Sequence, residues 1–182
     1  MTLGSDPLRW PAFVNGRSCP EPVLVPCEDR KLYLSETNMT DNFAQRVHDS
    51  FSQQRFMKTL GASLNSVAPG TVEIAVPFRL ELTQQNGFLH AGVITSVLDS
   101  ACGYAALSKA PQGADVLSVE FKVNLLSPAV GERFIARAQV KRAGRQITVC
   151  SADAFAVRGK EEKLVATMLA TMITMQPNNR SS

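Results

Sequence analysis

The sequence of 182 residues has few of the residue types that mark metal centres and disulfide frameworks. It contains two histidines, and its four cysteines lie far apart with no Cys-x-x-Cys pair. Structural zinc sites need clusters of such residues, so we expect no metal site. We also expect no redox cofactor. The cysteine usage favours a reducing compartment, and we expect a cytoplasmic protein.

Long apolar runs and a surplus of one charge are also missing. No apolar run approaches the roughly 20 residues that a membrane-spanning helix needs. The N-terminus has no basic start followed by an apolar segment, so we expect neither a targeting signal nor a membrane span. The formal net charge is only +3, and the lysines and arginines are scattered along the chain. Nucleic acid is therefore not an expected partner.

Three catalytic motifs are absent. The sequence has no Gly-x-Ser-x-Gly, no Gly-x4-Gly-Lys-Ser/Thr and no His-Glu-x-x-His. These motifs are typical of serine hydrolases, P-loop nucleotidases and zinc proteases, so those classes lose support. The chemistry that remains rests on carboxylates and backbone donors.

Prolines are concentrated near the start of the chain. Residues 1–38 hold five of the ten prolines and show no sustained hydrophobic period. We interpret this segment as an N-terminal extension that is poorly structured or wraps around the rest. A compact domain is expected over 39–176, followed by a frayed tail over 177–182.

The first regular element predicted is an amphipathic helix over about 41–60. Thr40 is a suitable N-cap, and apolar residues then recur every four positions, which places them on one face. Gly61 can adopt the left-handed conformation that commonly follows a last helical turn. After Gly61 the hydrophobic period changes from 3.6 to 2, which indicates strands.

Two groups of strands are predicted. Residues 63–67 and 71–77 flank Pro69-Gly70 and predict a hairpin. Four strands connected by turns are expected near the C-terminus, and the last of them, over 164–175, is apolar on both faces. That pattern predicts a central or doubly covered strand.

The first of these four strands, from Val116, shows a regular alternation of apolar and polar residues. Such alternation predicts a strand with one buried face, with Ser118 on the other face. The residues expected to point the same way are Leu117, Val119, Phe121, Val123 and Leu125.

A polar loop followed by an apolar helix is predicted over 83–107. Apolar or small residues occur on every side of this helix, as is typical of a helix enclosed by other elements. The order of elements is helix, two strands, loop, enclosed helix and four strands. It predicts an α+β domain in which one antiparallel sheet of about six strands wraps around the long central helix.

Asp99 is the one acid in the predicted helix, which contains no Lys or Arg to pair with it. A carboxylate in an enclosed helix needs hydrogen bonds, a partner from elsewhere or a chemical role. In a purely structural interpretation, hydroxyls such as that of Thr95 satisfy it.

The start of the same helix, near Ala91, is a second candidate. Its first backbone amides are donors at the positive end of the helix dipole and suit an anion or an oxyanion. Asp99 lies eight residues later, which is roughly 12 Å along the helix axis, so one substrate carbonyl cannot touch both within a single chain. Either they are unrelated, or a two-fold dimer brings the helix start and Gln84 of one chain beside Asp99 of the other.

Other candidates have an ordinary structural interpretation beside the functional one. His90 precedes the helix, where a loop or capping role is more common than that of a general base. Ser118 is an ordinary strand serine unless its face forms the site of a dimer. The predicted hairpin tip around Gly144 gathers three cations, including Arg142 and Arg145. Such a tip is usually just solvated, but it would also suit the phosphates of a nucleotide-bearing substrate.

The loop and helix together carry a recognisable motif: Gln84-x-x-Gly87-x-x-His90-Ala91-Gly92, followed by Asp99. With 118–122 and 127–129 in the same order, the chain resembles the hotdog-fold acyl-CoA thioesterases of the PaaI-like (phenylacetate-pathway) type over about 41–175. The resemblance implies a long central helix wrapped by an antiparallel sheet. It also implies homodimers that often pair into tetramers, with active sites shared between two subunits.

The resemblance implies a role for each matching position. Asp99 matches the catalytic acid, acting as a general base on water or as a nucleophile toward the thioester. Gln84 matches the residue that holds the water, and the Ala91 amide matches the donor that polarises the carbonyl. Ser118 supports the acid from its strand, and His90 orients the loop. Substrate contacts are expected from Gly92, Arg142, Gly144 and Arg145.

The chain departs from the usual His-Gly-Gly of that family at Ala91. The amide donor survives this change, but the methyl group could narrow the approach or resist a conformation that only glycine adopts. We therefore expect hydrolysis of acyl-CoA to a free carboxylic acid and CoA, with no cofactor. The alternative is a non-catalytic acyl-CoA-binding or regulatory hotdog protein.

Overall fold

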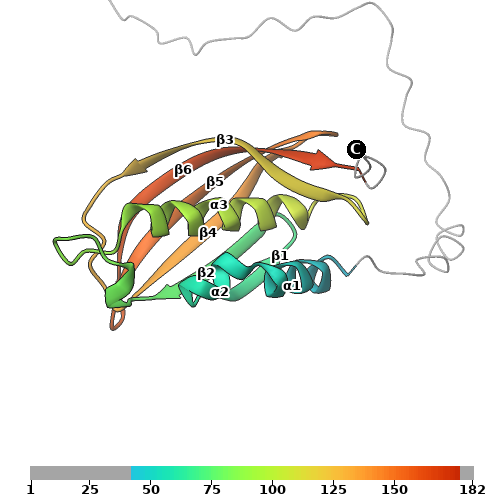
Figure 1. The fold of residues 1–182 in the computed structure, drawn as a ribbon. Coiled ribbons are helices and arrows are strands. Elements are labelled where there is room, and N and C mark those ends of the chain that lie inside the picture. The colour runs from blue at the N-terminus through green and yellow to red at the C-terminus, as the bar shows by residue number, and fades with distance from the viewer. Residues whose placement is uncertain (1–41, 177–182) are drawn as a thin grey trace, which may run out of the picture. The chain divides into compact units, whose positions relative to one another are not determined.

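The computed structural model describes residues 42–176 (Figure 1). The extension predicted over 1–38, the N-cap predicted at Thr40 and the tail predicted over 177–182 lie outside the described residues. The helices are α1 (Phe43–Gln53), α2 (Arg55–Leu60), the short 3-10 helix η2 (Leu80–Leu82) and α3 (Ala91–Leu107). The strands are β1 (Ser63–Ala68), β2 (Thr71–Pro77), β3 (Asp115–Leu125), β4 (Arg133–Ala143), β5 (Ile147–Arg158) and β6 (Glu161–Met175).

The amphipathic segment near the start forms two helices, so the prediction of one continuous helix is wrong. α1 begins after Asn42, whose side chain accepts a hydrogen bond from the Gln45 amide. Gln54 then has φ −77° and ψ 94°, an extended conformation that interrupts the helix before α2. The second helix ends as predicted, with Gly61 in the left-handed conformation at φ 70°.

All six strands form one antiparallel sheet in the order β1-β2-β4-β5-β6-β3. The curved sheet wraps around α3, which packs against β2 to β6, while α1 packs against β1 and α3 (Figure 1). The hairpin predicted over 63–77 is β1 and β2, with Gly70 at φ 83° in its turn. This arrangement confirms the predicted α+β hotdog fold.

The core fills the space between α3 and the sheet. Leu98 and Ala101 of α3 are completely buried, as are Ile74 of β2 and Ala170 of β6. Because the sheet and the N-terminal helices enclose α3, its buried residues lie on most sides of the helix, as predicted. Asp99 is half-buried among them.

The alternation predicted for β3 is wrong up to Val119, where the strand contains a β-bulge, whereas Val123 packs against the core as predicted. Ser118 pairs with Met172 of β6, and the next pair joins Glu120 to Thr171, so the register skips Val119. A bulge adds one residue to one strand and shifts the alternation of its side chains. Ser118 therefore faces α3, although the sequence pattern placed it on the opposite face.

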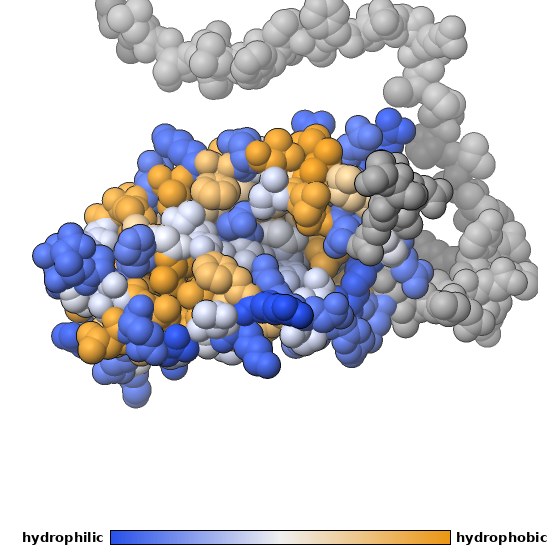
Figure 2. Space-filling model, in the orientation of Figure 1, coloured by the Kyte–Doolittle hydropathy of each residue, from blue (hydrophilic) through white to orange (hydrophobic). Residues whose placement is uncertain are grey.

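β3 lies at the edge of the sheet and leaves apolar side chains exposed. Leu117 is 55% exposed and Leu125 is 56% exposed, although both were predicted to be buried. Hydrophobic surface gathers over this strand in Figure 2. β6 is central in the sheet as predicted, but the described residues cover only one of its faces, because Leu169 is 54% exposed. An apolar edge strand of this kind is a template for pairing with another chain.

Candidate active site

His90 caps the N-terminus of α3. Its backbone is extended, with φ −63° and ψ 137°, and its Nδ1 accepts a hydrogen bond of 2.9 Å from the Gly92 amide. Because Nδ1 accepts, the neutral imidazole carries its proton on Nε2. The capping interpretation of His90 is thus the one that the geometry supports.

Only one of the first four amides of α3 is left without an acceptor in the described part of the chain. The Gly92 amide donates to the His90 ring, and the Val93 and Ile94 amides donate to the His90 carbonyl at 3.0 and 3.5 Å. No acceptor for the Ala91 amide lies within residues 42–176. Ala91 is the first helical residue, a conformation that any L-amino acid adopts, so glycine is not required there.

The loop before α3 positions Gln84. The Gln84 amide donates to the Phe88 carbonyl, and the Gly87 amide donates to the Gln84 carbonyl, both at 2.9 Å. The side-chain oxygen of Gln84 accepts from the Asn86 amide. Its Nε2 finds no acceptor among the described residues, so the side chain presents a donor to its surroundings.

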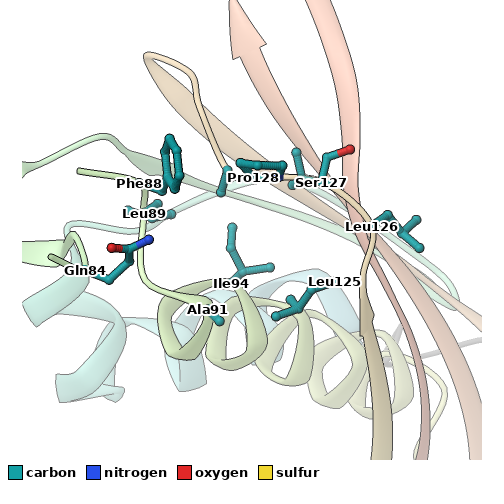
Figure 3. Close-up of a pocket in the computed structure, with 11 residues that line it drawn as sticks. Gln84, Phe88, Leu89, Ala91, Ile94, Leu125, Leu126, Ser127 and Pro128 are labelled. Atoms are coloured by element: carbon teal, nitrogen blue, oxygen red, sulfur yellow. The ribbon is translucent and has the colours of Figure 1, made fainter. Parts of the chain in front are cut away.

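A pocket of about 390 Å³ lies between this loop, the start of α3 and the end of β3 (Figure 3). Gln84 enters it from the loop, Ile94 rises from α3, and Leu125 and Leu126 lie on the opposite side (Figure 3). Ala91 also lines this pocket, which we call the loop pocket. Its remaining lining is mostly apolar: Phe88, Leu89, Ser127, Pro128, Ala129 and Val165.

Asp99 has a hydroxyl partner on β3. The Ser118 hydroxyl donates to Asp99 Oδ1 at 2.6 Å and lies 3.4 Å from the Met172 sulfur. An O–H···O⁻ bond of this length is charge-assisted and strong. No hydrogen bond joins Thr95 to Asp99 in the described part of the chain, so the hydroxyl partner is Ser118.

A second pocket of about 390 Å³ lies beside Ser118, along the C-terminal half of α3. We call it the helix pocket. Gln54, Ser100 and Tyr104 all line this pocket, and the sequence pattern identified neither Gln54 nor Ser100. The signal that could have found Gln54 is the polar pair Gln53-Gln54 within an amphipathic segment. The other lining residues are Ser50, Gln53, Gly103, Leu107, Asp115, Val116 and Leu117.

The structure does not bring the predicted catalytic residues together within one chain. Gln84 and Ala91 line the loop pocket, whereas Ser118, the partner of Asp99, lines the helix pocket. These pockets lie toward opposite ends of α3, and the helical rise separates Ala91 from Asp99 by roughly 12 Å. Within the described part of one chain, the predicted site residues therefore lie at two separate pockets.

The cationic hairpin tip lies at the same end of the sheet as Ser118. Ile147, just after the tip, pairs with Ile173 of β6, which also pairs with Leu117 of β3. The predicted phosphate contacts are all exposed on this β4–β5 tip: Arg142, Gly144 and Arg145.

Two buried thiols lie beneath the acid. Burial raises the pKa of Cys102, with Cys150 and Asp99 adding to the rise, and burial raises the pKa of Cys150 to about 11. Neither thiol is ionised at neutral pH, so neither is an activated nucleophile.

Among residues 42–176, no group of three or more His, Cys, Asp and Glu could hold a metal ion. No helix in that range is long and apolar enough to cross a membrane.

The chain is similar to several known thioesterases. Residues 86–163 match the thioesterase superfamily. A thioesterase family protein from Silicibacter pomeroyi is 54% identical with a TM-score of 0.73, and the match covers 74% of this chain and 98% of that one. Human acyl-coenzyme A thioesterase 13 is 29% identical over 119 residues, which are 64% of this chain and 84% of that protein.

A more distant solved structure has the same fold as this chain. The PaaI protein of E. coli, from the phenylacetic acid degradation operon, is 20% identical with a TM-score of 0.66. The match covers 73% of this chain and 93% of that one, and at this identity it shows the shared fold. The relative at 54% identity, matched over nearly its whole length, shows more: this chain belongs to the thioesterase superfamily and is a thioester hydrolase.

Proposed function

We propose that this thioesterase hydrolyses acyl-CoA to a free carboxylic acid and CoA at sites shared between two chains. The observation that carries the proposal is the separation of the two half-sites along α3. One end offers a single unpaired amide beside a side-chain donor, and the other offers a hydroxyl-supported carboxylate. Relatives named acyl-coenzyme A thioesterase support CoA esters as the substrates.

The loop pocket would bind and polarise the thioester carbonyl. The Ala91 N–H and the Gln84 Nε2–H are donors that can stabilise the negative charge developing on the carbonyl oxygen in the tetrahedral intermediate. The positive end of the α3 dipole adds to this stabilisation. Because the Gln84 oxygen accepts from the Asn86 amide, Nε2–H is the group that Gln84 offers, either to the carbonyl or to the water that the resemblance assigns to it. Gly92 would line the path by which the thioester enters the loop pocket.

Asp99 of the partner subunit would act as the general base. Its carboxylate accepts a proton from water while the water oxygen bonds to the thioester carbon, and the Ser118 hydroxyl holds the acid in place. The tetrahedral intermediate then collapses, the carbon–sulfur bond breaks, and Asp99 returns its proton to the CoA sulfur, which leaves as a thiol. These steps use water, the Asp99 and Ser118 side chains, and the Ala91 N–H and Gln84 Nε2–H donors.

The exposed edge of β3 would form the dimer interface. Two β3 strands that pair antiparallel about a two-fold axis place opposite ends next to each other. The Leu125 end of one strand, at the loop pocket, then meets the Ser118 end of its partner. This pairing also occupies the free backbone edge of β3 and places the partner strand beside Leu117 and Val119, which are 55% and 56% exposed in the single chain. Two such dimers could pair into a tetramer.

Replacing Asp99 with Asn tests the catalytic assignment. Asn is nearly isosteric but cannot accept the proton, so kcat should fall roughly 10²- to 10⁴-fold, with the native mass unchanged. Thiol release from a panel of aliphatic and aromatic acyl-CoAs measures the rate. The matched control is Asp153→Asn, a half-buried acid on β5 that should leave kcat unchanged. Equal hydrolysis by Asp99→Asn and the wild type would remove Asp99 from the mechanism.

The hairpin tip would contact the phosphates of CoA. Replacing Arg142 and Arg145 with Ala should raise KM for CoA esters, because two cations are lost from the phosphate site. Small thioesters such as N-acetylcysteamine esters should be affected much less. The double variant Arg158→Ala with Lys160→Ala removes the same charge from another hairpin and serves as the control. Equal changes in KM for both substrate types would contradict phosphate contact.

A further inference from the structure

We propose that the helix pocket holds the far end of the acyl group, and that Gln54 makes it select acyl groups with a neutral hydrogen-bonding oxygen at that end. The inference rests on the proposed hydrolysis at Asp99 and names its substrate class. Its basis is a polar cluster of Gln54, Ser100 and Tyr104, which the catalytic steps do not use.

Open space begins directly beyond the catalytic acid. Gly103 lies four residues after Asp99, which is roughly 6 Å along α3 and about 40° around it. Gly103 lines the helix pocket, and a Cβ built on it meets no atom within 4 Å. An acyl chain whose thioester carbon lies at Asp99 can therefore continue past Gly103 into this pocket.

The far wall of the pocket carries hydrogen-bonding groups. Gln54 Nε2 donates to the Ser100 hydroxyl at 3.4 Å, and the Tyr104 hydroxyl donates to Gln54 Oε1 at 3.3 Å. Ser100 is only 8% exposed and Tyr104 only 7%. Both bonds are long for such groups, so they are weak, and a substrate oxygen placed among the three groups would form better ones.

The break between α1 and α2 is what places Gln54 there. In a continuous helix this residue would follow the helical path, but its extended backbone releases the side chain toward α3. Burial raises the pKa of Tyr104, and the nearby Asp115 charge adds to the rise, while a hydrogen bond with Ser50 acts to lower it. Tyr104 is therefore a neutral phenol that can donate to a substrate oxygen.

The charges that line the helix pocket and its distance from Asp99 restrict further which acyl groups it can hold. None of the described residues that line the helix pocket carries a positive charge, so a terminal carboxylate would lose its hydration there without a cation to pair with. A hydroxyl carries no such penalty. Tyr104 lies five residues after Asp99, which is roughly 7.5 Å along the helix and about 140° around it, so the chain reaches it by passing Gly103. With bonds of about 1.5 Å meeting at about 111°, an extended chain advances roughly 1.25 Å per bond. The six bonds from the carbonyl carbon to the ω-oxygen of a hydroxylated six-carbon acyl group therefore span about that distance.

Three substrates of equal length test the selectivity: hexanoyl-CoA, its ω-hydroxy derivative and adipoyl-CoA. We expect kcat/KM to be about tenfold higher for the hydroxy ester than for hexanoyl-CoA, and lowest for adipoyl-CoA. Gln54→Leu and Tyr104→Phe should each bring the first ratio close to one. Gln45→Leu, a matched change on the exposed face of α1, should leave that ratio at the wild-type value.

Filling the pocket at Gly103 tests its location independently. Gly103→Leu should lower kcat/KM for all three substrates about 100-fold relative to acetyl-CoA, which does not reach the pocket. Gly103→Ala reports on the fold, because alanine stabilises a helix interior and meets no atom here. The native mass and melting temperature of each variant show that it is folded.

The outcomes separate this inference from the function on which it rests. If hydrolysis depends on Asp99 but the hydroxy ester has no advantage, or if Gln54→Leu preserves that advantage, the selectivity proposal is overturned and the hydrolase proposal stands. If Gly103→Leu affects acetyl-CoA as strongly as hexanoyl-CoA, the acyl group does not enter this pocket. Undiminished activity of Asp99→Asn would instead overturn the proposed function itself.

Discussion

Ala91 shows how much of the proposed chemistry depends on a single atom. The side chain departs from the glycine that the resemblance leads one to expect, yet the residue is helical and its amide keeps its hydrogen. The three following amides are occupied by His90, so the Ala91 N–H is the donor that the helix start can offer to a substrate. The departure therefore preserves the backbone donor and adds one methyl group to the loop pocket.

Replacing Ala91 with Pro removes that hydrogen while preserving the helix start. Proline is favoured at the first helical position, and His90 already has the extended conformation that a residue before proline requires. We expect the free energy of unfolding to change by less than about 1 kcal/mol, and kcat to fall roughly 10²- to 10³-fold. Urea denaturation and thiol release measure the two quantities.

Ala91→Ser is the matched control for this change, because it alters the side chain but keeps the amide. It should retain most of the wild-type kcat. A proline variant that folds normally and hydrolyses acyl-CoA at the wild-type rate would show that the Ala91 amide does not polarise the carbonyl.

At the scale of elements, α1 holds the C-terminal end of α3 in place. The Arg46 guanidinium donates to the carbonyls of Leu107, Ala110 and Pro111 at 2.8 to 2.9 Å. A helix ends with carbonyls that have no partner within the helix, and a cation there also complements the dipole. α3 lacks a glycine cap, since Ser108 follows it in a right-handed conformation. Arg46 therefore provides the cap from a different helix.

Replacing Arg46 with Ala should lower the free energy of unfolding by about 3 kcal/mol, because two part-buried carbonyls and one exposed carbonyl lose a charged donor. Equilibrium urea denaturation measures the change. Arg55→Ala is the control, since Arg55 is exposed on α2 and its loss should cost less than about 0.5 kcal/mol. A similar small loss for both variants would show that other contacts hold the end of α3.

At the scale of the whole molecule, the chain is incomplete in two respects. Its edge strand β3 leaves apolar side chains exposed, and the groups proposed to be catalytic lie at two separate pockets. Antiparallel pairing of β3 with a second copy would remedy both, because it covers the edge and joins the half-sites. The proposed activity is thus a property of the dimer.

Complementation between two inactive variants tests this claim directly. Asp99→Asn and Ala91→Pro damage opposite half-sites, so a mixed dimer has one site with both changes and one site with neither. Unfolding and refolding an equal mixture should restore about a quarter of the wild-type kcat, because half the dimers are mixed and half of their sites are intact. If each site lay within one chain, the refolded mixture would remain inactive.

The sequence by itself determined the features that depend on local chemistry. Hydrophobic periods of 3.6 and 2 predicted the enclosed helix and the hairpin over 63–77, and the turn glycines Gly61 and Gly70 marked where elements end. The helical rise predicted that Ala91 and Asp99 cannot share one substrate in one chain. These inferences concern residues close together in the sequence, so the pattern contains the information.

Only the tertiary structure decided the contacts between distant segments. The bulge at Val119 turned Ser118 toward Asp99, and the break at Gln54 turned an amide toward Tyr104. Neither irregularity has a local signature, because a bulge or a helix break is favoured by the pairing and packing that it permits elsewhere in the fold. The acid was therefore evident from the sequence, while its hydroxyl partner and the pocket beyond it depend on how the sheet closes around α3.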